Sequence, residues 1–116
     1  MTRSRDYINF IRDQLSVWKT VDTKQMFGCV GLYADDLMFG IISKNTIYFK
    51  VDDSNKNSYI KAGSETLTLF KSNSPVVSFY AVPAEILEDP SKCIEWANES
   101  LGIQKMRARK KQKSDR

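Results

Sequence analysis

The chain has 116 residues, a length that suits one domain with its own core. Its composition, 41% hydrophobic and 28% charged, excludes the class of disordered proteins, and the absence of histidine excludes Ser-His and Cys-His catalysis. The net charge of +4 is uneven, because residues 105–116 have seven Lys or Arg against one Asp and residues 1–104 have eleven against thirteen acidic residues. We expect a mildly acidic domain over residues 1–104 and a basic C-terminal extension over residues 105–116.

The sequence contains no signal for secretion or membrane insertion. Charged residues begin at Arg3, and nowhere do about 18 apolar residues follow one another. We therefore expect no membrane segment, a cytoplasmic location, and two reduced cysteines, Cys29 and Cys93.

The first predicted element is an amphipathic helix of roughly four turns. Apolar residues recur at helical spacing, with polar residues between them, at Tyr7, Phe10, Ile11, Leu15 and Trp18. This helix has one face to bury.

Residues 24–53 form three apolar runs, separated by Asp35-Asp36 and by residues 43–46. Such short turn signals predict an antiparallel meander of three strands. Strict alternation in the second run would place Met38 and Ile42 together on one face, and both faces of that run are then apolar. We expect helices on one face and a second subunit or partner on part of the other, so that a charge at Met38 or Ile42 would give a folded monomer.

The remaining elements complete an order of α-β-β-β-α-β-β-α. They are a short helix over 57–62, strands over 66–70 and 76–82, one helical turn over 84–88, and a helix that begins at Asp89-Pro90-Ser91 and becomes irregular after Ala108. This pattern predicts an α+β fold, a two-layer sandwich with an antiparallel five-stranded sheet and helices packed on one face.

An ordered series of short motifs resembles a known family. Between Lys24 and Leu101 the chain contains Met26-Phe27-Gly28, Gly31-Leu32-Tyr33, Met38-Phe39-Gly40, Tyr48-Phe49-Lys50-Val51-Asp52, Ala62-Gly63-Ser64, Tyr80-Ala81-Val82-Pro83 and Trp96-Ala97. Together they resemble the N-terminal domain of the TfoX/Sxy family of bacterial competence regulators. The resemblance implies a domain often seen as a homodimer, which acts with the cyclic-AMP receptor protein in the transcription of genes for DNA uptake.

Two surfaces are candidate sites. The basic extension could bind nucleic acid without sequence preference, through Arg107, Arg109, Lys110 and Lys111, or could be a solvated terminus. A dimer or partner face would include Met38, Ile42, Tyr48 and Tyr80. Sheet aromatics could also stack bases, although packing is the favoured interpretation.

Outside these two surfaces, the sequence does not indicate a catalytic or metal-binding site. The pairs Asp35-Asp36 and Asp52-Asp53 could hold a cation but are also typical of turns, and Lys50 could be a base or the partner in a cross-strand ion pair. The sequence has no Gly-rich phosphate loop and no metal-ligand spacing. We therefore predict no enzyme, no metal and no cofactor, and a regulatory domain that binds a protein partner.

Overall fold

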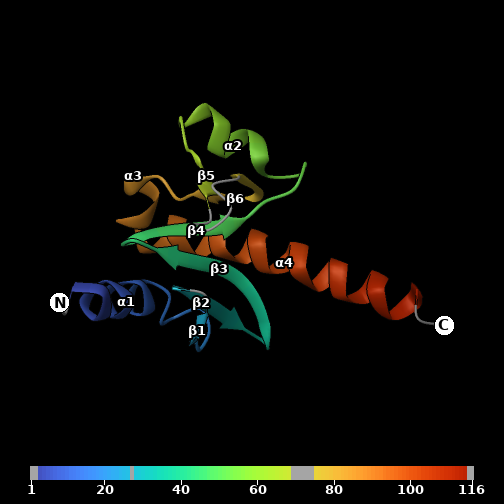
Figure 1. Cartoon of the computed structure of the whole chain (residues 1–116), viewed down its shortest axis with the longest axis horizontal. Helices are drawn as coiled ribbons and strands as arrows, with labels where there is room; N and C mark the ends of the chain where they lie inside the picture. The colour runs from blue at the N-terminus through green and yellow to red at the C-terminus, as the bar shows by residue number, and fades with distance from the viewer. Residues whose placement is uncertain (1–2, 27, 69–74, 115–116) are drawn as a thin grey trace.

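A computed structural model of the chain describes residues 3–26, 28–68 and 75–114 (Figure 1). The fold is α+β, as the sequence predicts. The elements, in chain order, are α1 (Arg3–Gln14), β1 (Asp22–Met26), β2 (Cys29–Ala34), β3 (Leu37–Ser43), β4 (Thr46–Lys50), α2 (Lys56–Lys61), β5 (Thr66–Thr68), β6 (Pro75–Ala81), α3 (Ala84–Leu87) and α4 (Pro90–Ser114).

The sheet has six strands in the order β1-β2-β3-β4-β6-β5, and each neighbouring pair is antiparallel. The predicted number, five, is wrong because the first apolar run folds as two strands. Met26 pairs with Cys29, and Gly28 between them has a φ of +79°, a conformation that glycine adopts without the steric cost of a side chain. A reversal at Gly28 therefore adds β1 as an edge strand.

A β-bulge between β2 and β3 changes which residues share a face. Leu32 pairs with Gly40 and Tyr33 pairs with Met38, which leaves Phe39 without a partner on β2. Beyond this extra residue the alternation is shifted by one position. Ile42 consequently packs with the main core, whereas Ile41 packs on the opposite face.

The main core lies between the sheet and a layer of helices on one face. Helix α4 packs against β3 and β4, and α1 and α3 pack against α4. Tyr59 of α2 joins this layer, because its ring centroid lies 4.6 Å from that of Trp96 and 6.0 Å from that of Tyr80. The largest fully buried apolar side chains are Tyr59, Phe39, Phe49, Ile11, Leu15, Leu32, Ile47, Leu67 and Leu101.

Two helices differ in length from the prediction. Helix α1 ends at Gln14, and residues 15–18 form turns in which the Trp18 backbone N–H donates to the Leu15 carbonyl at 3.0 Å. Helix α4 continues to Ser114, well past Ala108 (Figure 1). Arg, Lys and Gln dominate this last part, and they are good helix formers even where no apolar surface is buried.

The hairpin of β5 and β6 is described only in part. Strand β5 covers Thr66–Thr68, and β6 covers Pro75–Ala81. Residues 69–74, which include the end of the strand predicted over 66–70, lie outside the described residues.

Two glycine-to-alanine substitutions test this packing, and we expect them to change the free energy of unfolding in opposite directions. A Cβ at Gly40 would lie 3.1 Å from the Phe49 ring and 3.1 Å from the Tyr48 carbonyl oxygen, whereas a Cβ at Gly102 would meet nothing within 4 Å. We expect Gly40→Ala to lower the free energy of unfolding by about 1–3 kcal/mol, and Gly102→Ala to raise it by about 0.5–1 kcal/mol. Urea denaturation measures both, and a Gly40→Ala protein as stable as the parent would contradict the register of β3.

Candidate functional site

The four residues predicted for a dimer or partner face lie on two different faces of the sheet. Met38 and Tyr48 are half-buried on the face without helices, where they pack around Ile41, Leu67 and Phe79. Ile42 and Tyr80 pack on the opposite face, within the helix-covered core. The structure therefore brings Met38 and Tyr48 together and separates them from the other two.

The reason for expecting a partner at Ile42 is consequently wrong. Ile42 is only 4% exposed because the helices of the same chain cover it. The bulge at Phe39 causes the difference, since strict alternation would have placed Ile42 beside Met38. Among the described residues, the half-buried apolar residues that pack against Ile41, Leu67 and Phe79 on the face without helices are Met38, Tyr48 and Cys29.

The basic residues of the extension lie on a helix. Arg107, Arg109 and Lys110 are exposed on α4, and the Lys111 side chain lies outside the described part of the structure. Figure 1 shows α4 continuing past the sheet toward the C-terminus. Arg109 and Lys110 thus lie on a regular helix, rather than on the irregular segment that the sequence predicts after Ala108.

Polar contacts fix α4 where it leaves the sheet. The Gln104 side-chain amide donates to the Met38 carbonyl oxygen at 2.7 Å. The Lys105 ammonium lies 2.9 Å from the Asp35 carboxylate, which also pairs with Lys19 at 3.1 Å. Hydrogen bonds from Lys105 and then Lys19 lower the pKa of Asp35. Because these ion pairs are solvent-exposed, they add little to the stability of the fold and mainly help to orient α4.

The acidic pair Asp35-Asp36 forms the turn between β2 and β3. Both residues have positive φ, 52° and 66°, as two-residue hairpin turns require. The Asp35 carboxylate pairs with two lysines. Within the described residues there is no group of three or more Cys, Asp or Glu that could hold a metal ion.

Lys50, at the end of β4, differs from both sequence interpretations. The residue is 7% exposed, and its ammonium lies 5.3 Å from the ring centroid of the cross-strand residue Phe79. Among the described residues this cation–π contact takes the place of the predicted ion pair. Burial lowers the pKa of Lys50, the charge of Arg107 lowers it further, and Asp52 opposes them.

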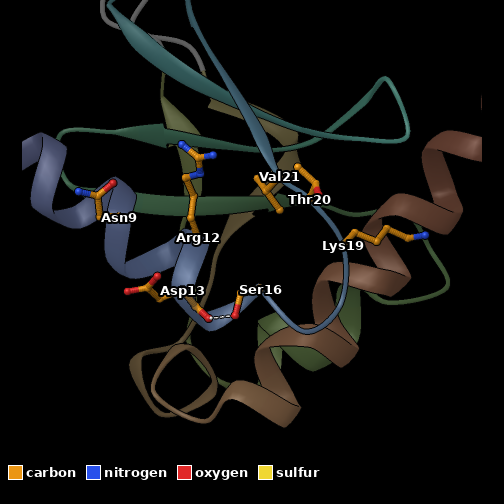
Figure 2. A pocket seen from close by; sticks show the side chains of 7 residues that line it. All are labelled: Asn9, Arg12, Asp13, Ser16, Lys19, Thr20 and Val21. Atoms are coloured by element: carbon orange, nitrogen blue, oxygen red, sulfur yellow. Dashed lines mark hydrogen bonds between the residues drawn. The ribbon is translucent and has the colours of Figure 1, made fainter.

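A shallow groove of about 540 Å³ lies along the polar side of α1 and the link to β1 (Figure 2). It is lined by Asn9, Arg12, Asp13, Ser16, Lys19, Thr20 and Val21. In Figure 2 the Lys19 side chain points away from the other six. The Ser16 hydroxyl donates to the Asp13 carbonyl, so it serves the end of α1. These residues contain no nucleophile held beside a base. The groove is a polar surface along α1 and the link that follows it.

The two cysteines are free, as predicted, and differ in environment. Cys29 is half-buried on the face without helices, whereas Cys93 is fully buried in α4. Burial raises the pKa of the Cys93 thiol from an ordinary value of 9.0 to about 11. Cys93 therefore behaves as an apolar core residue.

A comparison with known families matches residues 13–103 to the TfoX N-terminal domain. The chain belongs to the TfoX N-terminal domain family. The match confirms the family that the motif series suggested and covers most of the chain. A comparison with curated proteins finds no significant match. In the part of the chain that the structure describes, no helix is long and apolar enough to cross a membrane.

Sequence reasoning missed how the end of α4 meets the sheet. Arg107 follows Ser100 by seven residues, so both lie on one side of α4, and Ser100 contacts β4. The helix predicted up to Ala108 contains both residues, so its periodicity could have shown that they share a side. The pairing of Asp35 with Lys105 has no comparable signal, because it depends on the crossing of α4 over the β2–β3 turn.

The cysteine environments predict different reactivity and a pH-dependent stability. At pH 8 a disulfide reagent should modify one thiol per chain, Cys29, and the second only after unfolding, because Cys93 is inaccessible and protonated.

The raised pKa of Cys93 stabilises the fold below pH 9, and this contribution should disappear as the pH rises from about 9 to about 11. Urea denaturation at each pH measures the loss, and Cys93→Ala should reduce its slope. Rapid modification of both thiols would contradict the assignment.

Proposed function

We propose that the chain is a noncatalytic regulatory domain that binds a protein partner in the control of transcription, in the cytoplasm. Its membership of the TfoX N-terminal domain family over residues 13–103 is the observation that supports this proposal most directly. By the same resemblance, the genes concerned are those of competence for DNA uptake, and the partner is the cyclic-AMP receptor protein.

The proposed contact surface is the face of the sheet without helices. Met38, Tyr48 and Cys29 are half-buried there beside buried Ile41 and Phe79. Aromatic and methionine side chains are enriched at protein interfaces, where they supply large contact areas. We propose that this same face joins two copies of the chain into a homodimer.

A pair of charge substitutions separates this interface from the core. Met38→Glu should leave a folded chain, with a loss of about 1 kcal/mol, and should convert a dimer into a monomer in sedimentation experiments. Ile42→Glu buries a charge in the helix-covered core and should lower the free energy of unfolding by at least about 3 kcal/mol. A folded Met38→Glu protein with unchanged sedimentation would contradict the proposed dimer face.

Binding of the regulator partner can be measured with purified components. Titration calorimetry of the full chain against the cyclic-AMP receptor protein, with cyclic AMP and nuclease present, should give a saturable complex. Replacing one anchor of a protein interface commonly reduces affinity tenfold or more, so we expect that effect from Tyr48→Ala if this face contacts the regulator. Exposed Lys61 of α2 supplies the control, and Lys61→Gln should leave the affinity unchanged. The absence of a complex at high micromolar concentration would contradict the proposal.

Nucleic-acid binding by the basic end of α4 is the second candidate function. Exposed Arg107, Arg109 and Lys110 lie on a helix that continues past the sheet (Figure 1). Cations on such a helix can neutralise backbone phosphates and release counterions, which gives affinity without sequence readout.

A further inference from the structure

The side of α4 that faces the sheet changes from apolar to basic. Cys93, Ala97 and Ser100 lie on this side and are fully buried, and Arg107 lies on the same side two turns after Ser100. Arg107 itself is exposed. The helical spacing therefore places Arg107 on the side of α4 whose earlier residues pack against the sheet.

Lys50 is fixed at that margin by its own backbone. The Lys50 carbonyl oxygen accepts a hydrogen bond from the Ser100 hydroxyl at 2.7 Å and another from the Asn55 side-chain amide at 3.3 Å. Both donor residues are buried. Lys50 as a whole is buried, and its ammonium lies 5.3 Å from the Phe79 ring centroid. The charge thus has a defined position where β4 ends.

The basic corner, as we call it, consists of Lys50, of Arg107, which acts electrostatically on Lys50, and of Lys110. Lys50 and Lys110 both act electrostatically on Asp52. The Asp52 carboxylate accepts hydrogen bonds from the Ser54 backbone N–H and hydroxyl, at 2.8 and 2.5 Å. The next residue, Asp53, pairs with Lys56 at 3.4 Å. Lys50 and Arg107 thus place two positive charges near one another on a chain whose first 104 residues are net negative.

Two of these cations act on one another unfavourably. Burial lowers the pKa of Lys50 and the charge of Arg107 lowers it further, so the ammonium is less stable in this position than in water. Within the described residues neither Lys50 nor Arg107 forms an ion pair. A bound anion would offset both effects, because it would interact favourably with each cation.

We propose that the basic corner binds a phosphate of a nucleic-acid backbone. This inference rests on the second candidate function and adds a residue of the folded domain, Lys50, to the cations of the helix. A nucleic acid fits better than a single acidic side chain, since it offers further phosphates to the basic residues that follow along α4. Because only the backbone is contacted, the binding has no sequence preference.

The test compares charge-matched variants of the full chain. Binding to a labelled DNA duplex of about 20 base pairs is measured by fluorescence anisotropy between about 50 and 300 mM salt. We expect Arg107→Gln and Lys50→Met each to weaken binding about five- to tenfold at 100 mM salt and to reduce the salt slope by about 1. Lys50→Met keeps the buried stem, and Lys61→Gln, an exposed substitution on α2, should have no effect.

Arg109→Gln distinguishes the basic corner from a diffuse effect of helix charge. Arg109 lies about 200° around the helix from Arg107, on the side away from the sheet. We expect its loss of affinity to be at least threefold smaller than that of Arg107→Gln. Equal losses would overturn the basic corner and leave nucleic-acid binding by the helix intact.

Two further outcomes bear on the proposal. Absence of DNA binding by the parent chain would overturn both the basic corner and the second candidate function, without touching the proposed protein partner. If poly-glutamate competes as strongly as DNA at equal charge, the basic corner would instead bind an acidic protein. That result would also overturn the proposed phosphate site. If Lys50→Met fails to fold by circular dichroism, the comparison of Arg107 with Arg109 decides the question.

Discussion

Burial of one side of α4 against β3 and β4 is the constraint on which the rest of the structure depends. Cys93, Ala97 and Leu101 lose contact with water there, and this loss is the main favourable contribution to packing the helix on the sheet. The polar contacts follow from that position. Ser100 can donate to the Lys50 carbonyl oxygen, and Gln104 to the Met38 carbonyl oxygen, only because the apolar residues of α4 hold the helix against the sheet.

The elements with strong periodicity were predictable from the sequence. Apolar residues three and four positions apart identified α1 and the packed part of α4, and Pro90 marked the start of α4. The second hairpin and the Asp35-Asp36 turn were also predicted, since their signals are local. The family resemblance added the expected function but not the geometry of any site.

The features that were missed depend on single backbone positions or on distant partners. The reversal at Gly28 interrupts an apolar run without a polar turn residue, and the bulge at Phe39 exchanges the faces of Ile41 and Ile42. A prediction from strict alternation assumes that successive residues point to opposite faces, so it cannot detect the extra residue of a bulge. The position of Lys50 beside Arg107 depends on where α4 packs on β4, a contact between residues that are about 50 positions apart in the sequence.

The two proposed surfaces meet at Lys50. Its ammonium lies over Phe79, which belongs to the face without helices, while Arg107 approaches from the helix side. A protein partner that covers Phe79 must therefore either remove water from the Lys50 ammonium, which is costly, or present an anion to it. A phosphate already bound there would supply that anion. Partner binding and phosphate binding are thus expected to change each other's affinity by the same factor, because coupling between two binding sites is reciprocal.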